Sequence, residues 1–429
     1  MVYLNTMMTR FVLLLVGSLT AFVAKSQDWD HRHAFAKSYY GLSLIGAPAM
    51  AEGLLVDEDV VMPFGRSAFL SPAVNIGATH FWGHADFYVS INTVPIKLGN
   101  DEVKNSIHMG TFTGLRVYPW AVGEGQGVEP YLGYKFSPWR YRQGDTPELS
   151  YKTTRIKGMV DAGLGLATSW GYFTLEGTKL LNPDFEVNLT TTGGPTSDRW
   201  PGWTVGMGLN ISLETTSVAS NPVNKQLNQE LREHNSRGLF VAAGPSSAFP
   251  VVDSEGVADA YPYLDDRSFP TIFPDVALGY HFTKADALVA VSRRRMVQRR
   301  SAYNRALNID RQSTVLETYK FVGDYHGFVP YIGVGVGMER MDLEEREGDV
   351  VVSEGSYEEM PWYLVFGWDI RPSERGDWWV LRTNLRIPPQ LELDHDDHTW
   401  SLQHLEFNFI QLVVYPQRWT RARDLAKAG

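Results

Sequence analysis

Apolar and polar residues alternate along most of this chain with a period of two. Between Trp203 and Leu213, apolar residues occupy every second position, and Thr, Gly, Gly, Asn and Ser lie between them. A strand places two such sets on opposite faces, whereas a helix scatters both sets around its axis. The pattern therefore predicts strands with one apolar and one polar face.

The same alternation recurs in eight segments of each half of the chain. The predicted strands begin near Tyr40, Pro72, Ala85, Ile107, Val128, Arg155, Gly171 and Gly202, and then near Gly238, Phe273, Ala285, Leu316, Val329, Met360, Gly376 and Leu402. Connections after odd strands are long and polar, such as residues 183–201 and 339–358, while those after even strands are tight. Long loops on one rim and short turns on the other are typical of transmembrane β-barrels.

A short motif occurs at corresponding places in the two halves and indicates an internal duplication. Residues 115–136 contain Glu-Pro-Tyr-Leu-Gly after a glycine turn, and residues 319–338 contain Val-Pro-Tyr-Ile-Gly-Val-Gly. We expect an all-β protein with two homologous eight-stranded antiparallel up-and-down barrels, residues 27–214 and 238–419. Sixteen strands could also close as one wide barrel. The polar linker, residues 215–237, favours two barrels because it is much longer than the other even-strand turns, and its QLNQELREH segment could form a short helix.

The polar face of the predicted strands carries charges of both signs interleaved with glycines. Its charged members are Asp86, Arg116, Lys135, Asp161 and Glu176 in the first half, and Asp275, Lys320, Asp324, Asp369, Arg382, Arg386 and Glu406 in the second. A narrow lumen suits this composition, because glycines make room and opposite charges relieve each other's desolvation. We expect a charge network in each lumen, with Arg116 paired to Asp86 or Asp161 and Arg382 paired to Glu406.

The apolar face is then expected to contact lipid. Tryptophans stand near its ends, as in an interfacial girdle, at Trp82, Trp170, Trp203, Trp362 and Trp368. A soluble lipid-binding barrel is the alternative, because its strands alternate in the same way with the faces inverted.

Residues 1–26 have the form of a cleavable export signal. Arg10 precedes an apolar run of about fourteen residues, too short for a stable helical span, and Ala24-Lys25-Ser26 supplies small residues before Gln27. The absence of cysteine excludes thiol catalysis, disulfides and Cys-based metal sites. The net charge of -10 argues against nucleic-acid binding.

The strand Gly-Leu-Arg-Val-Tyr-Pro, followed by a turn and Pro-Tyr-Leu-Gly, resembles the small eight-stranded outer-membrane barrels of the OmpA and OmpX type. The Ser26-Gln27 junction resembles export signals common in Bacteroidetes. The resemblance implies a place in the cell outer membrane, with outer-membrane lipid and lipopolysaccharide as partners. One departure concerns the C-terminus, where such barrels end on an aromatic residue and this chain continues as a basic tail, residues 420–429.

Two charged segments lie outside the predicted lumens. The run SRRRMVQRRS places Arg293, Arg295 and Arg299 where they would project outward near lipid headgroups, and guanidinium groups pair well with lipid phosphates. Residues 394–398, DHDDH, carry oxygen and imidazole ligands without a rigid spacing, so a solvated turn is the preferred interpretation and no metal site is predicted.

These observations predict a structural or surface-binding role through long extracellular loops, with the surface ligand undetermined. A sixteen-stranded porin-like channel for small polar solutes is one alternative. The other is a lipid-modifying hydrolase or acyltransferase, since His404 and Glu406 share an inward face and His281 shares another. Inward histidines are more typical of a polar plug, so we expect no enzyme activity, no catalytic residue and no cofactor.

Overall fold

The computed structural model describes residues 35–50, 53–57, 60–80, 84–99, 105–120, 127–144, 151–168, 171–187, 196–214, 222–234, 237–250, 261, 263–264, 272–325, 327–371, 378–388, 392–395, 398–401 and 404–428. The predicted export signal lies outside these residues. No helix within the described ranges is long and apolar enough to cross a bilayer.

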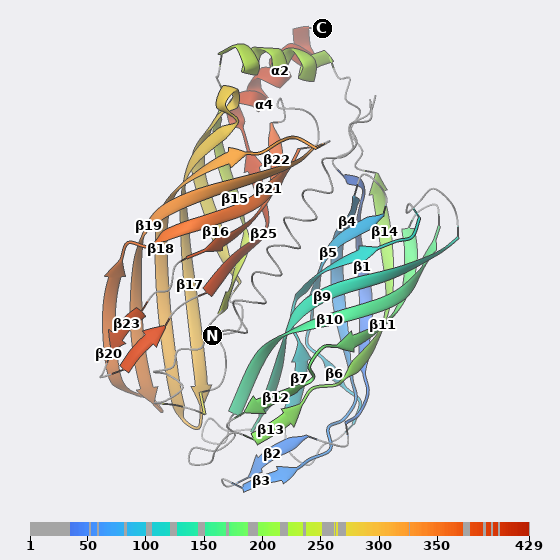
Figure 1. Ribbon diagram of the computed structural model, residues 1–429, viewed down its shortest axis with the longest axis vertical. Helices are drawn as coiled ribbons and strands as arrows, with labels where there is room; N and C mark the ends of the chain where they lie inside the picture. The colour runs from blue at the N-terminus through green and yellow to red at the C-terminus, as the bar shows by residue number, and fades with distance from the viewer. Residues whose placement is uncertain are drawn as a thin grey trace.

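The first half of the chain closes into a barrel of eight antiparallel strands (Figure 1). These strands are β1 (Phe35–Ala47), β4 (Phe69–His80), β5 (Ala85–Asn92), β8 (Phe112–Val117), β9 (Val128–Gln143), β10 (Tyr151–Ala167), β11 (Gly171–Leu180) and β14 (Trp203–Glu214). The ring closes because β1 pairs with β14 on one side and with β4 on the other. We call this ring barrel 1.

The second half closes in the same way into barrel 2. Its strands are β15 (Leu239–Pro250), β16 (Ile272–Phe282), β17 (Ala287–Ala302), β18 (Arg305–Phe321), β19 (Phe328–Glu347), β21 (Trp362–Ile370), β22 (Trp379–Ile387) and β25 (His404–Val414). Closure comes from the pairing of β15 with both β16 and β25. The prediction of two eight-stranded barrels is confirmed. The single wide barrel is wrong, because β14 pairs with β1 and β11 and leaves no edge for β15.

The repeated motif occupies the same place in both rings. Residues 115–136 span the fourth and fifth strands of barrel 1, β8 and β9, and residues 319–338 span the fourth and fifth strands of barrel 2, β18 and β19. Tyr131 and Tyr331 both point into their lumens, each with 3% of its surface exposed. The motif therefore lies at equivalent positions in the two rings.

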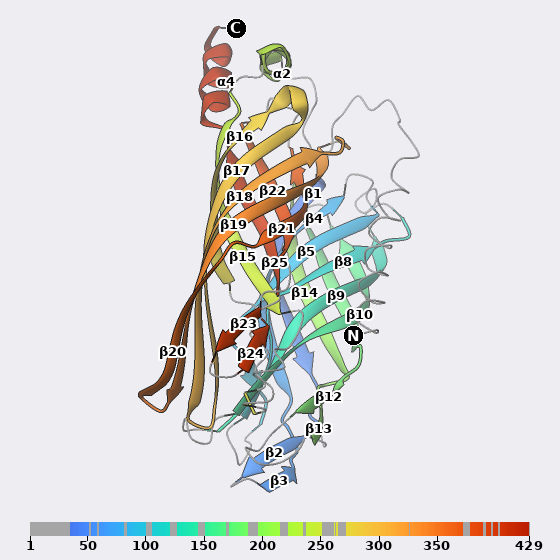
Figure 2. The same ribbon diagram turned by 60° about the vertical axis from the view of Figure 1, so that its left-hand side comes forward.

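Short strands extend the barrels at the end opposite the helices (Figure 2). They are β2 (Leu54–Asp57), β3 (Val60–Pro63), β6 (Ile96–Lys97), β7 (Asn105–Met109), β12 (Asp184–Val187), β13 (Thr196–Arg199), β20 (Val350–Glu359), β23 (Glu392–His395) and β24 (His398–Ser401). We call this end the extended rim.

Residues 339–358, expected to form a loop, are instead the end of β19 and most of β20, paired with each other. The alternation in this segment is inverted relative to the lipid-facing part of the strand: apolar Met341 and Leu343 point inward, and charged residues such as Arg340 and Glu344 point outward. The segment therefore looks like a polar loop in the sequence. β18 likewise begins at Arg305, well before the expected Leu316.

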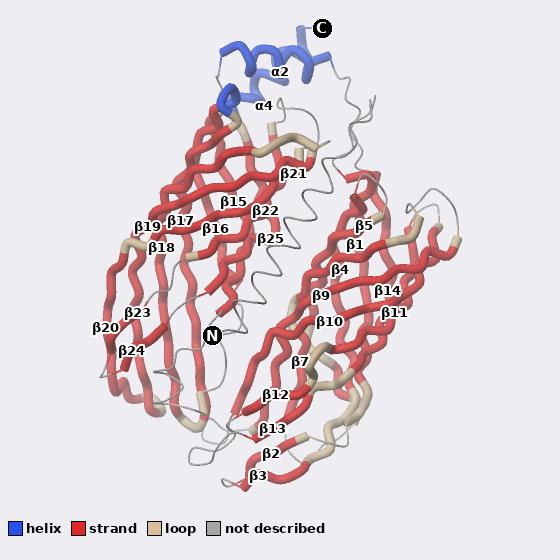
Figure 3. Tube along the Cα trace, in the orientation of Figure 1, coloured by secondary structure: helices blue, strands red, loops and turns tan. Residues whose placement is uncertain are grey.

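Two helices cover the other end of barrel 2 (Figure 3). α2 (Pro222–His234) confirms the short helix expected in the linker, and α4 (Pro416–Ala428) includes most of the predicted basic tail. A short 3-10 turn, η2 (Thr283–Ala285), joins β16 to β17, and Thr283 donates a hydrogen bond to a backbone carbonyl of α2. Glu230 of α2 accepts hydrogen bonds from Arg421 of α4, which lower the pKa of its carboxyl group. We call α2 and α4 the helical cap.

An aromatic cluster at the extended rim connects the two barrels. The rings of Tyr151, at the start of β10, and Tyr303, in the β17–β18 turn, have centroids 6.1 Å apart. Tyr263 packs on Tyr303 at 5.9 Å, and Tyr261 donates a hydrogen bond of 2.6 Å to Glu345 of β19. Burial and this carboxylate together raise the pKa of Tyr261 to about 12. The barrels therefore stand side by side with a common apolar contact at this end (Figure 1).

A band of exposed apolar side chains surrounds each barrel. On β19, Ile332, Val334, Val336 and Met338 follow one another at alternate positions and are 46–61% exposed. From Phe328 to Met338, a strand rises about 33 Å, or about 25 Å along the axis at the usual tilt. Trp203 and Trp362 are 53% and 55% exposed on the same outer surfaces, and Trp368 is half-buried. Trp82 and Trp170 lie outside the described residues.

Candidate functional site: the charged lumens

Alternation along the strands turns all five predicted charged residues of barrel 1 inward. Asp86, Arg116, Lys135, Asp161 and Glu176 are each at most 7% exposed. They come from β5, β8, β9, β10 and β11, which are consecutive in the ring, so their side chains share one side of the lumen.

Glu176 is the centre of this first network. Its Oε1 accepts a hydrogen bond of 2.6 Å from Lys135 Nζ, and its Oε2 accepts one of 3.0 Å from Arg116 Nη2. Lys135 also lies 3.8 Å from Asp161 Oδ1. The predicted pairing of Arg116 with Asp86 or Asp161 is therefore wrong. Arg116 reaches Glu176 across two intervening strands, β9 and β10, where Gly133 and Gly163 lie in the register and the side chains of Asp161 and Tyr131 pack against them.

Aromatic side chains complete the filling of barrel 1. Asp86 accepts hydrogen bonds from the hydroxyl groups of Tyr118, at 2.7 Å, and Tyr172, at 3.4 Å. The guanidinium of Arg116 lies 4.1 Å from the ring centroid of Tyr88, a cation–π contact. Each of the five predicted charged residues of this lumen thus has either an opposite charge or a hydroxyl donor beside it.

In barrel 2, Arg382 forms a two-pronged ion pair with Asp369. The distances are 2.7 Å from Nε to Oδ1 and 2.9 Å from Nη2 to Oδ2. The predicted pairing of Arg382 with Glu406 is wrong, because Asp369 is the direct neighbour of Arg382 across β21 and β22. Glu406 lies further along the lumen, opposite Arg386 in the register of β22 and β25.

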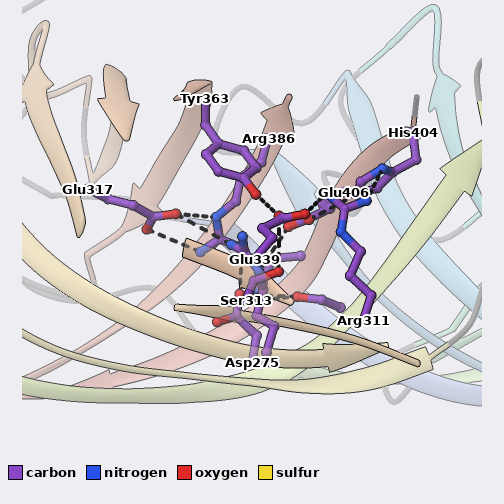
Figure 4. A network of polar contacts seen from close by, with 12 residues as sticks. Asp275, Arg311, Ser313, Glu317, Glu339, Tyr363, Arg386, His404 and Glu406 are labelled. Atoms are coloured by element: carbon purple, nitrogen blue, oxygen red, sulfur yellow. Dashed lines mark hydrogen bonds and ion pairs between the residues drawn. The ribbon is translucent and has the colours of Figure 1, made fainter. Parts of the chain in front are cut away.

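Arg386 joins two carboxylates from different walls of barrel 2 (Figure 4). Its Nε lies 2.5 Å from Glu317 Oε1, and its Nη1 lies 2.5 Å from Asp275 Oδ2. Arg386 and both carboxylates are 1% exposed or less. A single guanidinium therefore spans the lumen from β22 to β16 and β18.

A second chain of contacts continues towards the extended rim. Glu339 accepts hydrogen bonds from Ser313 and Tyr363 and pairs with Arg311. Arg311 Nη1 lies 2.7 Å from His404 Nδ1, and His404 Nε2 lies 3.0 Å from Glu406 Oε1 (Figure 4). Arg311 Nη1 also lies 3.1 Å from His404 Nε2, so the imidazole stands between a guanidinium, which can only donate, and the carboxylate of Glu406, which accepts.

Lys320 and Asp324, predicted to face the lumen, are exposed instead: Lys320 lies on the outward side of the β18 alternation, and Asp324 follows the end of that strand. Among the charged lumen residues of barrel 2, Arg294, Arg311, Glu317 and Glu339 were not identified from the sequence. Arg294 had a usable signal, since it alternates with the outward Arg293 and Arg295; its Nε lies 3.1 Å from Glu406 Oε2. Glu339 was hidden because its segment resembled a loop. With these four included, the network extends through barrel 2 without an unpaired charge among the residues named here.

The other sequence candidates do not converge on a reactive centre. His281 is buried beneath the helical cap, where its Nδ1 lies 3.1 Å from Arg418 Nη2. His395 contacts Tyr357 and Ser353 in the extended rim, and Asp396 and Asp397 lie outside the described residues. The described part of the chain holds no group of three or more residues suited to bind a metal ion.

The three arginines predicted to project outward are exposed on the outer face of β17. Arg295 forms a two-pronged ion pair with Asp310 of β18, with Nη2 at 2.5 Å from Oδ2. Arg293 and Arg299 lie on the same face, two and four residues away.

Comparisons with known proteins return structural matches alone. No family model matches the sequence, and no curated protein matches it. Among solved structures, Ail, the attachment invasion locus protein of Yersinia pestis, is 13% identical over 42% of this chain and 97% of its own, with a TM-score of 0.26. The translocator domain of autotransporter NalP from Neisseria meningitidis is 7% identical over 96% of both chains, with a TM-score of 0.19. OmpT, an outer membrane protein of Vibrio cholerae, is 11% identical over 88% of this chain and 98% of its own, with a TM-score of 0.17. At such low scores, the functional assignment rests on the geometry described above.

Proposed function

We propose that this chain is an outer-membrane protein whose two plugged barrels hold a binding surface outside the cell. The observation that carries the proposal is the combination, in each barrel, of an exposed apolar outer band with a charged and filled interior. Water-soluble barrels reverse this arrangement, because their apolar residues fill the core.

The dimensions of the band support insertion into a bilayer. Its height of about 25 Å on β19 equals the apolar band of transmembrane barrels. Closed rings leave no unpaired strand edge within this band, which a bilayer requires because it offers no hydrogen-bonding partner to the backbone. The predicted export signal would bring the chain to this location.

The lumens support an anchoring role rather than transport. Eight-stranded barrels have interiors just wide enough for side chains. Here the space is occupied by paired charges and aromatic rings, and the helical cap covers one end of barrel 2. A wide sixteen-stranded channel is no longer a candidate, since the chain forms two separate rings.

A catalytic role is not part of the proposal. The polar atoms of His404 contact Arg311 and Glu406 inside barrel 2, away from the lipid-facing surface where an acyl chain would enter. The extended rim is the better candidate for function, because β19 and β20 continue well past the apolar band and carry exposed side chains on both faces of β20.

The test is single-channel recording of the refolded mature chain in a planar bilayer, with heat-modifiable gel migration as the check of folding. We expect insertion with little or no conductance. The variant Arg382→Ala removes the partner of Asp369 and should lower the unfolding temperature or open intermittent small conductances, because a buried carboxylate is left uncompensated. Large, steady conductance steps from the wild-type chain would refute the plugged-barrel proposal.

A further inference from the structure

The outer face of barrel 2 carries a row of basic residues directly beyond its apolar band. Arg293 is level with Thr314 and Met338 in the registers of β17, β18 and β19, and Met338 is the last exposed apolar residue of the band on β19. One step further along the strands, Arg295 and Arg340 flank Gln312. This height is where lipid headgroups meet the hydrocarbon of a bilayer.

The arginines of this row keep donors available. Arg295 uses Nε and Nη2 to bind Asp310, which leaves its Nη1 directed away from that carboxylate. Arg340 uses Nε to bind Asp342 at 3.2 Å. Each carboxylate restrains its arginine on the strand surface, so less side-chain entropy remains to be lost when a ligand binds.

Arg293 and Arg299 add positive charge that these carboxylates do not balance. The pairs Arg295–Asp310 and Arg340–Asp342 are each neutral, and Arg293 and Arg299 add two further positive charges on the outer face of β17. Glu344, level with Arg299 in the register, is already paired with Arg346. On the side of β19 away from β17, exposed Glu358 is the register partner of Arg340. These side chains are accessible, since Arg295 is 63% exposed and Arg340 is 57% exposed.

Apolar side chains lie among these arginines. Val291 and Val297 are 47% and 52% exposed on β17, before and after Arg293 and Arg295, and Ile272 of the adjacent β16 is 58% exposed. Inorganic phosphate has no apolar part that could contact these side chains. A lipid does, because its acyl chains can pack against them.

We propose that Arg293, Arg295, Arg299 and Arg340 bind phosphate groups of anionic lipid in the outer leaflet. Guanidinium groups donate in a fork that matches two phosphate oxygens, which an ammonium group cannot do. The inference rests on the proposed membrane location, and it adds a specific lipid site on β17 and β19.

The test is a native mass spectrometry titration of the detergent-solubilised mature chain. Dioleoyl phosphatidic acid, which has an exposed phosphate, is compared with dioleoyl phosphatidylcholine, whose phosphate is shielded. We expect the wild-type chain to prefer phosphatidic acid by about tenfold, the ratio that two exposed ion contacts supply together. An equal affinity for the two lipids would overturn the proposal.

The variant Arg293→Gln with Arg299→Gln should lose most of this preference. Its matched control, Arg423→Gln with Lys427→Gln, removes the same charge from exposed positions on α4 and should keep the preference. The variant Arg293→Lys with Arg299→Lys keeps the charge without the fork and should give an intermediate value. Equal loss in the matched control would show a general charge effect and no site.

Competition by inorganic phosphate separates a lipid site from a free-phosphate site. Displacement of phosphatidic acid at phosphate concentrations similar to those of the lipid would overturn the lipid assignment. A failure of the proposed function would appear earlier, as the absence of a heat-modifiable, bilayer-inserted species. A correctly inserted chain that binds both lipids equally would contradict the lipid-phosphate site alone and leave the proposed membrane location intact.

Discussion

Replacing Arg386 with methionine tests whether the charge network stabilises barrel 2 as a unit. The substitution keeps an unbranched side chain of similar reach but removes the guanidinium that contacts Glu317 and Asp275. Both carboxylates are 1% exposed or less, so water cannot replace the lost partner. Removing one member of a buried ion pair costs about 3–5 kcal/mol, because the remaining charge stays desolvated.

The magnitude depends on what else compensates the two carboxylates. Glu317 retains the hydroxyl of Tyr319 as a donor and Arg294 at 3.5 Å, while Asp275 retains neutral donors from Asn408 at 3.2 Å and Ser246 at 3.3 Å. The remaining cation and both donors to Asp275 are more distant than the 2.5 Å contacts that Arg386 makes, and the donor from Tyr319 is neutral. We therefore expect a loss of about 3 kcal/mol in the free energy of unfolding, at the lower end of the range for buried pairs.

The assay is equilibrium urea unfolding in lipid vesicles, with Arg295→Met as the matched control. Arg295 makes a similar two-pronged pair with Asp310, but it is 63% exposed, and such pairs contribute about 0–1 kcal/mol. Adding Asp275→Asn and Glu317→Gln to the Arg386→Met variant should recover part of the loss, since neutral groups need no counter-charge. Equal costs at Arg386 and Arg295 would refute the argument that burial gives the network its strength.

Two further predictions concern packing and pH. A Cβ at Gly163 would lie 2.4 Å from the ring of Tyr131, so Gly163→Ala should destabilise barrel 1 by about 1–3 kcal/mol in the same urea assay. The control is Gly177→Ala, whose Cβ would meet no atom within 4 Å and which should change the free energy of unfolding by less than about 0.5 kcal/mol. In the helical cap, the hydrogen bond from Arg421 lowers the pKa of Glu230 in the folded state below its value of 4.5 in the unfolded chain. This contribution is therefore fully present above that unfolded pKa and is lost as the pH falls through the lower, folded pKa. Tryptophan emission from α4 should report release of the cap during acid titration, and Arg421→Gln should remove that pH dependence; an unchanged titration in the variant would count against this pair.

The local pattern was sufficient to predict the barrel strands and the direction of most of their side chains. Period-two alternation turned Asp86, Lys135 and Glu176 inward, and the same rule turned Arg293 and Arg295 outward. It failed where the outward positions carry charge, as in β19 and β20 beyond the apolar band. Alternation was still present there, but it lacked the apolar face by which a strand is distinguished from a polar loop.

The sequence by itself determined the strand count, the facing of most residues and the linker between the halves, because these depend on neighbours along the chain. Only the tertiary structure decided that the strands close as two rings, since closure depends on pairing between β1 and β14 and between β15 and β25. It also decided which charges meet. Arg116 reaches Glu176 across two intervening strands, and Arg386 crosses to Asp275 on another wall. Such partners depend on the register between strands and on the packing of neighbouring side chains against glycines, and the spacing of residues within one strand contains neither.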